Sequence, residues 1–320
     1  MTITVILCTY NRCRVLATAL SSLAASMLPQ SVEWEVLVVD NNSRDQTRAV
    51  VEDFCRRYPG RFRYMFEPRQ GKSYALNTGI RDARGEVLAF VDDDVTVEPT
   101  WLQNLTVALH KGGWAGAGGR VLPMRRFVPP AWLALEGPRS LAGALYAYCD
   151  PGDVPGELKR PPYGANMAFR REMFDRYGDF RTDLGPFPDS KIGFEDTEFG
   201  RRLLASGERL CYVPSATVYH EINEKRVRKD HFLAWWFDLG RGSVRQTEKS
   251  LSATEILKVL TRVLLTTPRW LLTLDPQRRF YSKCRIWYEA GKVVESYRQS
   301  RQVYYNPENS GAPECAVRTK

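Results

Sequence analysis

The chain has 320 residues, of which 43% are hydrophobic and 26% are charged, and its formal net charge is +9. This composition is that of an ordinary globular protein with one large core, or one core and a smaller appendage. No run of 18 or more apolar residues occurs, which argues against a membrane-spanning helix. Seven scattered cysteines without a CxxC pair or a matching histidine argue against a disulfide framework and a zinc site.

The start of the chain has neither a basic leader nor a small-residue cleavage site, so we predict a first strand there and not a signal peptide. The cysteine pattern fits a reducing compartment, and we therefore expect a cytoplasmic protein. Charge is uneven along the chain, because residues 221–320 hold 19 Lys and Arg against 11 Asp and Glu. We expect this basic rear part to face an anionic surface.

The first half alternates apolar runs with amphipathic stretches. Strands are predicted at 3–7, 35–39, 62–66 and 87–91, and helices at 14–27, 46–58, 74–84 and in the stretch that follows Pro99. This alternation predicts βαβ units and a parallel sheet with right-handed crossovers. The glycine-rich run 115–119 lacks the spacing of a dinucleotide-binding turn, so we interpret it as close backbone packing.

Residues 123–162 show no clear periodic pattern of apolar residues, and they are rich in proline, glycine and aromatic residues. A connection of this length is usually functional or mobile. Beyond it the pattern predicts helices near 172–177 and 196–206 and a strand pair at 210–213 and 217–220.

The last part of the chain is predicted to be helical. Ser252 and Glu255 have the spacing of a capping box, and we expect Pro268 to stop the helix that they begin. Asp275 and Pro276 are then interpreted as the N-cap and first position of a second helix.

Three carboxylates, Asp92, Asp93 and Asp94, directly follow the apolar run at 88–91. If that run is a buried parallel strand, the acids lie at its carboxyl end, where open α/β sheets bind ligands. Strand alternation places Asp92 and Asp94 on one side, where they could share a hard divalent cation. The alternative is a solvated acidic turn after a core strand.

Six segments together resemble the family 2 glycosyltransferases, which are inverting enzymes with the glycosyltransferase A fold. They are CTYNR (8–12), VVDNNS (38–43), GKSYALN (71–77), VDDD (91–94), GANMAFR (164–170) and GFEDTEF (193–199). Each segment alone is weak, but their order and spacing are specific, and the resemblance runs from about Thr2 to His220.

The resemblance implies an α/β fold with a single nucleotide-binding, Rossmann-like, mostly parallel sheet flanked by helices, followed by a C-terminal helical extension. Residues 1–222 would form the catalytic domain, with a nucleotide-binding half at 1–122 and an acceptor half at 123–222. Residues 223–320 would form the basic helical extension.

The resemblance also implies where a nucleotide-sugar would bind. The expected residues are Thr9, Tyr10, Asn11, Arg12, Asp40, Asn42, Lys72, Asn77, Asp92 and Asp93. Two of them have plainer alternatives, since Asp40 could cap a turn and Lys72 could be solvated at a helix start.

For the metal, the resemblance implies Mn²⁺ or Mg²⁺ on Asp94 and Asp92, with His220 as a third ligand. A lone histidine is often structural, and an imidazole ligand would suit Mn²⁺ better than Mg²⁺.

For catalysis, the resemblance implies that Asp196 is the general base and that Glu195 orients a bound sugar. The alternative is that these two acids stabilise the start of a helix through its dipole. Asn166 and Gly164 are expected on the acceptor side, although Asn166 could instead serve a turn. The aromatic residues Trp132, Tyr146, Tyr163 and Phe187 could stack on sugars or only pack.

The expected function is metal-dependent, inverting transfer of a sugar from a nucleotide-diphospho-sugar, expected to be UDP-linked, to a saccharide or lipid-linked acceptor in glycan biosynthesis. The alternative is a catalytically silent nucleotide-sugar-binding or scaffold protein on the same fold. No recognition motif supports nucleic-acid binding.

A basic segment, 225–229, precedes the aromatic cluster 231–237. Cations beside aromatic residues suit an anionic membrane surface, such as the inner face of the membrane, where a lipid-linked acceptor would be found. Equally, the aromatic residues could pack this helix onto the catalytic core.

Overall fold

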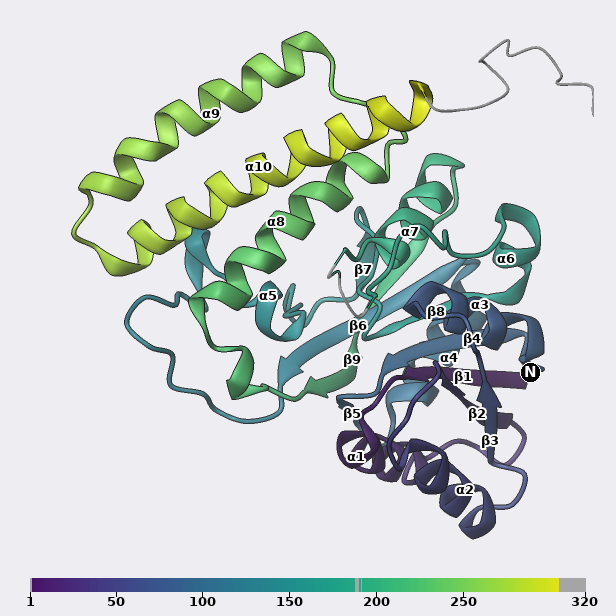
Figure 1. Ribbon diagram of the computed structural model, residues 1–320. Coiled ribbons are helices and arrows are strands. Elements are labelled where there is room, and N and C mark those ends of the chain that lie inside the picture. The colour runs from purple at the N-terminus through teal and green to yellow at the C-terminus, as the bar shows by residue number, and fades with distance from the viewer. Residues whose placement is uncertain (1, 188–189, 191, 305–320) are drawn as a thin grey trace, which may run out of the picture.

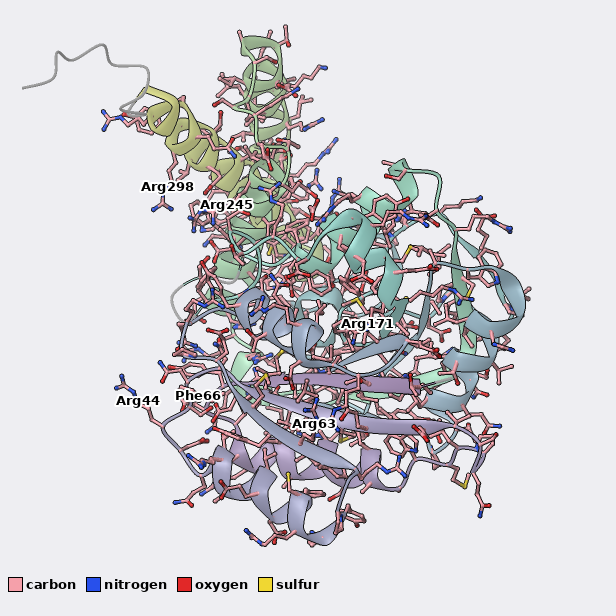
Figure 2. All side chains as sticks on the ribbon, turned by 90° about the vertical axis from the view of Figure 1, so that its right-hand side faces the viewer. Arg44, Arg63, Phe66, Arg171, Arg245 and Arg298 are labelled. Atoms are coloured by element: carbon pink, nitrogen blue, oxygen red, sulfur yellow. The ribbon has the colours of Figure 1, made fainter. Side chains whose placement is uncertain are left out.

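The computed structural model describes residues 2–187, 190 and 192–304. A mixed sheet lies at the centre with helices on both of its faces, and a group of long helices lies beside one end of it (Figure 1). Turning the molecule shows that the hairpin of the last two helices projects from the rest (Figure 2).

The first half of the chain forms the predicted parallel arrangement. Its strands are β1 (Thr2–Thr9), β2 (Glu33–Asp40), β3 (Phe62–Phe66) and β4 (Val87–Asp92), and its helices are α1 (Cys13–Ala24), α2 (Thr47–Arg57) and α3 (Lys72–Asp82). Strands β3, β2, β1 and β4 lie side by side and parallel, so their carboxyl ends meet at one edge of the sheet.

The second half adds strands of both directions. It contains β5 (Val95–Val97), α4 (Trp101–Gly112), β6 (Gly116–Pro123), β7 (Gly156–Leu158), β8 (Met167–Arg170), α6 (Arg171–Tyr177), α7 (Glu195–Ala205) and β9 (Leu210–His220). The described strands follow the order β3-β2-β1-β4-β8-β6-β9-β5, with β7 paired to β9. Pairing is antiparallel between β4 and β8 and between β5 and β9.

The strand pair predicted after residue 209 is one strand, β9, with an irregularity in its middle. Along β6, Gly119 is opposite Val213 and Arg120 is opposite Thr217, so three residues of β9 have no partner there. A Cβ atom on Gly119 would lie 1.9 Å from the carbonyl oxygen of Ala216 in this bulge. The glycine-rich run therefore is a strand that packs closely against backbone, and it is not a cofactor loop.

Both faces of the sheet are buried. Val5 and Leu7 of β1 pack toward Leu16 and Leu20 of α1, whereas Ile6 packs on the opposite face toward α3. The second face is rich in phenylalanines that contact one another mostly edge to face, which are Phe90, Phe169, Phe174, Phe180 and Phe199. Continuous burial of the parallel strands explains why they read as apolar runs and not as alternating patterns.

The C-terminal part contains α8 (Lys229–Arg245), α9 (Ala253–Leu272) and α10 (Pro276–Tyr304). The capping box at Ser252 and Glu255 is present, as predicted. The expected end of the helix at Pro268 is wrong, because α9 continues to Leu272. Proline has no N–H group, so the backbone carbonyl four residues earlier loses its hydrogen-bond donor. Because Pro268 is exposed, water can bind that carbonyl instead, and the helix does not have to end.

The irregular stretch before residue 162 contains the short helices η1 (Gly137–Arg139) and α5 (Gly143–Tyr146). It shares a hydrophobic cluster with the C-terminal helices, in which Leu133 and Leu145 pack with Phe232 of α8 and Phe280 of α10. Over the described residues, we find no helix with the length and apolar character needed to cross a bilayer.

Candidate active site

A cavity of about 820 Å³ lies at the carboxyl edge of the parallel strands. Residues far apart in the sequence line it, including Thr9 at the end of β1, Asp92 at the end of β4 and Lys72 at the start of α3. Glu195 and Asp196, at the start of α7, line the same cavity. The acid triplet and the second acid pair thus meet at one site, as the sequence predicted.

Lys72 links the two groups of acids directly. Its Nζ lies 2.7 Å from Asp92 Oδ1 and 3.5 Å from Glu195 Oε1. Burial disfavours the charged ammonium, but the nearby carboxylates outweigh it and raise the pKa of Lys72. Burial also opposes ionisation of Asp92, yet Lys72 is close enough to hold the pKa of that carboxyl below its ordinary value.

The surroundings of Glu195 disfavour the ionised form of its carboxyl group. Its side chain is buried, and desolvation raises its pKa to about 7 despite the attraction of Lys72. The proximity of Asp196 acts in the same direction as burial. Glu195 can therefore exchange a proton close to neutral pH.

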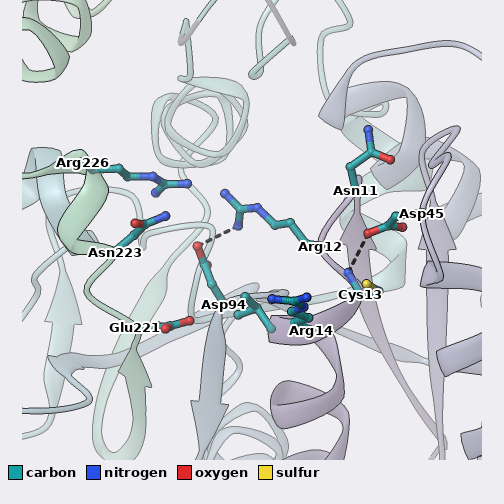
Figure 3. A pocket seen from close by; sticks show the side chains of 10 residues that line it. Asn11, Arg12, Cys13, Arg14, Asp45, Asp94, Glu221, Asn223 and Arg226 are labelled. Atoms are coloured by element: carbon teal, nitrogen blue, oxygen red, sulfur yellow. Dashed lines mark hydrogen bonds and ion pairs between the residues drawn. The ribbon is translucent and has the colours of Figure 1, made fainter.

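Asp93 and Asp94 share a single guanidinium. Arg12 Nη1 lies 2.7 Å from a carboxylate oxygen of each acid, and Thr9 Oγ1 donates a hydrogen bond of 2.7 Å to Asp93. Asp93 is buried, which raises its pKa to about 6. In a smaller adjoining pocket of about 350 Å³, Arg12 and Arg226 reach toward each other from opposite sides above Asp94 (Figure 3).

Asp92, Asp94 and His220 have the donor atoms and spacing of a metal site. One oxygen of each carboxylate and one imidazole nitrogen lie within 4.8 Å of one another. His220 reaches this position because β9 pairs with β5, whose Val95 is opposite His220 and directly follows the triplet. His220 Nδ1 lies 2.9 Å from the carbonyl oxygen of Glu221, which can only accept, so Nδ1 carries the proton.

The hydrogen bond of Nδ1 fixes the ring so that the other nitrogen, Nε2, faces the acids and lies 3.4 Å from Asp94 Oδ1. Carboxylates beside an imidazole that a backbone carbonyl orients are a donor set that suits Mn²⁺. The residues present therefore fit a divalent cation.

Asp196, at the start of α7, is held by two backbone N–H groups. Gly164 donates to Oδ2 at 2.6 Å and Thr197 donates to Oδ1 at 2.6 Å. Phe194, just before the helix, has a left-handed backbone with a φ of 82°, and its ring lies where a Cβ atom of Gly242 in α8 would be. The C-terminal helices therefore help to hold the turn that presents Asp196 to the cavity.

Most of the predicted site residues line the cavity. These are Thr9, Tyr10, Arg12, Lys72, Asp92, Asp93, Asp94, Glu195, Asp196 and His220. Asn11 lines the adjoining pocket, and Gly164 lies behind Asp196 as one of its hydrogen-bond donors.

Besides Gly164, four predicted residues line neither of these pockets. Asp40 is buried and accepts hydrogen bonds from the Tyr64 hydroxyl and the Ser43 N–H, which is the turn-capping alternative for this residue. Asn42, just after it, has a left-handed backbone with a φ of 65°. The other two are asparagines with structural partners.

The side-chain amide of Asn77 bonds both backbone groups of Phe180, and it joins α3 to the segment before α7. The amide of Asn166 accepts from the Trp101 indole and donates to the carbonyls of Arg120 and Ala216. Both side chains are buried in these hydrogen bonds and neither lines the cavity, so their predicted contacts with the sugar and the acceptor stay predictions.

Residues of α8 line the cavity without having been predicted as site residues. They are His231, Trp235 and Leu239, which recur every four positions and so form one stripe of the helix. That spacing was visible in the sequence, but the aromatic cluster was interpreted as a membrane contact or as core packing. Tyr146, Tyr163 and Phe187 also line the cavity.

Two other tryptophans only pack. Trp132 contacts the rings of Phe232 and Phe280, and Trp236 contacts those of Tyr281 and Tyr288. The aromatic cluster of α8 is thus directed at the cavity and at α10, in agreement with the packing alternative.

Comparison with known proteins gives consistent results. Residues 4–178 match the family described as glycosyl transferase family 2. The succinoglycan biosynthesis protein ExoM of Rhizobium meliloti (strain 1021) is 32% identical over 229 residues, which are 71% of this chain and 68% of that protein. The glucosyl-dolichyl phosphate glucuronosyltransferase of Haloferax volcanii is 28% identical over 246 residues, which are 74% of this chain and 75% of that protein.

Solved structures agree on the fold. The mannosyltransferase PcManGT from Pyrobaculum calidifontis, solved with GDP-Man and Mn²⁺, has a TM-score of 0.55 and 19% identity, and the match covers 95% of this chain and 75% of that one. S. aureus TarS 1-349, solved with UDP-GlcNAc, has a TM-score of 0.52 and 17% identity, with coverage of 94% and 92%.

Proposed function

This chain belongs to glycosyl transferase family 2 and is a glycosyltransferase, and from that premise we propose that it performs metal-dependent, inverting sugar transfer. The donor is a nucleotide-diphospho-sugar, for which we keep UDP as the nucleotide, and the acceptor is a saccharide or a lipid-linked saccharide. The observation that carries the proposal is the single cavity in which Lys72 connects Asp92 to Glu195, with Asp196 beside it.

The donor side lies at the ends of β1 and β4. Asp92, Asp94 and His220 would hold Mn²⁺ or Mg²⁺, and a divalent cation bound there neutralises negative charge on a departing diphosphate. Arg12 neutralises the negative charge of Asp93 and Asp94 in this structure. Once a metal ion supplies positive charge to those acids, Arg12 is placed to contact phosphate oxygens. PcManGT and TarS were solved with GDP-Man and UDP-GlcNAc, which supports a nucleotide-sugar as donor.

Asp196 is the general base of the proposed reaction. Two N–H donors hold its carboxylate in one orientation, while its remaining lone pairs are available to the cavity. The carboxylate takes the proton of an acceptor hydroxyl as that oxygen bonds to the anomeric carbon and the bond from that carbon to the diphosphate breaks. Attack opposite to the leaving group inverts the configuration.

Lys72 and Glu195 position the reacting groups. Lys72 connects the acid that would bind the cation to the helix that carries the base, so donor and base keep a constant separation. Glu195 is buried beside the base, where its carboxyl can orient a sugar hydroxyl.

The acceptor side extends into α8. Trp235 and Tyr163 offer flat faces on which sugars stack, and both line the same cavity as Asp196. A relative named glucosyl-dolichyl phosphate glucuronosyltransferase supports a lipid-linked acceptor, and one named succinoglycan biosynthesis protein supports a role in polysaccharide synthesis.

Asp196→Asn tests the proposal. The substitution keeps the shape of the side chain but removes the proton acceptor, so transfer should fall by roughly 10²- to 10⁴-fold, while nucleotide-sugar affinity remains near that of the original protein. Turnover is measured with Mn²⁺ and the donor, and affinity by calorimetry.

Glu198→Gln is the matched control, because Glu198 is on the same helix and bonds Arg202 instead of lining the cavity. Retained turnover in Asp196→Asn would contradict the assignment of the base. Donor binding without turnover in the original protein, with any acceptor or water, would favour the scaffold alternative.

A further inference from the structure

Helix α9 exposes a continuous row of large apolar side chains. Its leucines are between 55% and 80% exposed at six positions, which are Leu257, Leu260, Leu264, Leu265, Leu271 and Leu272, and Leu274 in the following turn is 99% exposed. Within α9, Val259 is the buried residue. Single exposed leucines are normal on a soluble protein, but a row of this length marks an interaction surface.

The row lies along one face of the helix. Leu257, Leu260, Leu264 and Leu271 are separated by three, four and seven residues, a spacing that places them on one side of a helix with 3.6 residues per turn. Helix α9 packs along α10 at the outer edge of the molecule (Figure 1), and the hairpin of the two helices projects away from the catalytic body (Figure 2).

The surface around this row is basic. Residues 253–304 contain ten Lys and Arg against four Asp and Glu. Two of these acids are buried in ion pairs, Glu295 with Arg241 and Arg245, and Glu289 with Lys292 and Arg262. Half of the acidic residues of the hairpin are therefore hidden, and the cations outnumber the acids on its outer surface.

The cations of α9 are placed beside the apolar face and not within it. Lys258, Arg262 and Arg269 are separated by four and seven residues, so they form a second row, which borders Leu265 and Leu272 at the edge of the apolar face, and all three are exposed. An apolar face bordered by Lys and Arg is the pattern of a helix that lies in the interface of an anionic bilayer. A second copy of the chain would bring the same positive charge to the contact and would be repelled.

We propose that α9 docks on the surface of a membrane that contains anionic phospholipids. The leucines enter the boundary between headgroups and acyl chains, and Lys258 and Arg269 contact phosphate groups beside them, whereas Arg262 is paired with Glu289 of α10. The helix lies in the plane of the membrane and does not cross it, since in the described part of the chain no helix qualifies as a span. The inference moves the membrane contact from residues 225–237 to α9, and it does not depend on the proposed reaction.

The test is co-sedimentation of the full chain with vesicles. One preparation contains phosphatidylcholine alone, and the other contains about 30 mol% phosphatidylglycerol in addition. We expect binding to the anionic vesicles to exceed binding to the neutral ones by roughly tenfold and to weaken in about 0.5 M NaCl, which screens the charges.

The double variant Leu260→Glu/Leu264→Glu should lose binding to the anionic vesicles by roughly tenfold or more. Its matched control is Val128→Glu/Val154→Glu, since these residues are 90% and 82% exposed and lie on loops far from α9 in the sequence. The control should bind as the original chain does. Thermal melts check that both variants fold, which is expected because no buried side chain is changed.

Three results would overturn the proposal. The original chain could fail to sediment with either vesicle, or the leucine variant could bind as well as the original. Alternatively, light scattering without lipid could show a dimer that the leucine variant dissociates, while neither protein sediments with vesicles. That last outcome would assign the row of leucines to a contact between copies.

Discussion

Three adjacent carboxylates at the end of β4 have three different environments. Asp92 bonds Lys72, Asp93 bonds Thr9 and Arg12, and Asp94 bonds Arg12 and faces His220. Neighbours in a sequence differ this much because successive side chains at a strand end point in different directions. Only Asp92 and Asp94 fall within the cluster that could hold a cation.

At the scale of residues, His220→Ala should separate Mn²⁺ from Mg²⁺. Loss of the imidazole should weaken Mn²⁺ binding by at least roughly tenfold in the presence of UDP, whereas Mg²⁺, which prefers oxygen ligands, should be affected much less. Calorimetric titration of each ion measures the difference. His110→Ala is the control, because His110 is exposed on α4. Unchanged Mn²⁺ affinity in His220→Ala would exclude His220 as a ligand.

Glu195 should make stability depend on pH in the metal-free protein. Burial raises the pKa of Glu195 from 4.5 to about 7, so the unfolded chain ionises at lower pH than the folded one. The contribution of this group to the free energy of unfolding is therefore fully present below pH 4.5, and it is lost as the pH rises through 7.

Glu195→Gln should remove that loss. Relative to the original chain, the variant should gain up to about 3 kcal/mol of unfolding free energy between pH 4 and pH 8, as urea denaturation would measure. Glu33→Gln, at an exposed position, should show no such trend. A difference that stays constant with pH would mean that the pKa of Glu195 is the same in the folded and the unfolded chain.

At the scale of elements, the contact between α8 and α10 depends on small residues on both helices. A Cβ atom on Gly240 would lie 2.0 Å from the carbonyl oxygen of Tyr288, and one on Gly291 would lie 2.0 Å from that of Phe237. The two backbones approach closely there, and this approach fixes α8, whose stripe of His231, Trp235 and Leu239 lines the cavity.

Gly240→Ala should destabilise the protein by about 1–3 kcal/mol, because the added methyl group forces α8 and α10 apart. Alanine is otherwise favoured over glycine within a helix by about 1 kcal/mol, so a net loss reports the clash. Thermal unfolding measures it. Gly156→Ala, where nothing lies within 4 Å of the added atom, should change stability little, and equal melting of the two variants would contradict a close helix contact.

At the scale of the whole molecule, the predicted boundary at residue 222 separates parts that share a core and a cavity. Leu133 and Leu145 pack with Phe232 and Phe280 from beyond that boundary. Trp235 and Leu239 line the cavity that contains Asp196. The division into a catalytic domain and an extension stays a prediction, and the packing argues that the two parts depend on each other.

A chain that ends at residue 222 should therefore melt at a lower temperature and lose transfer to acceptor. Exposure of the shared cluster accounts for the lower stability, and loss of α8 accounts for the lost acceptor side. Thermal shift and turnover assays measure both effects, and Phe232→Ala in the full chain should reproduce part of the loss. If the shortened chain kept full stability and turnover, residues 1–222 would be an independent catalytic domain.

The sequence alone determined the features that depend on local pattern. Apolar runs between amphipathic stretches predicted the parallel half of the sheet, and the spacing of Ser252 and Glu255 predicted the start of α9. Sheet geometry predicted that the acid triplet lies at the carboxyl edge of the sheet, whereas the site roles of Lys72, Glu195 and Asp196 came from the resemblance to family 2 glycosyltransferases.

Only the tertiary structure decided what depends on contacts between distant segments. Asn77 and Asn166 carry the same amide as any sugar-binding asparagine, and their partners Phe180, Trp101 and Ala216 are known only from packing. The stripe on α8 and the leucine row on α9 are both amphipathic patterns in the sequence. One faces the cavity and the other faces outward, because a periodic pattern shows that a face is apolar and does not show what covers it.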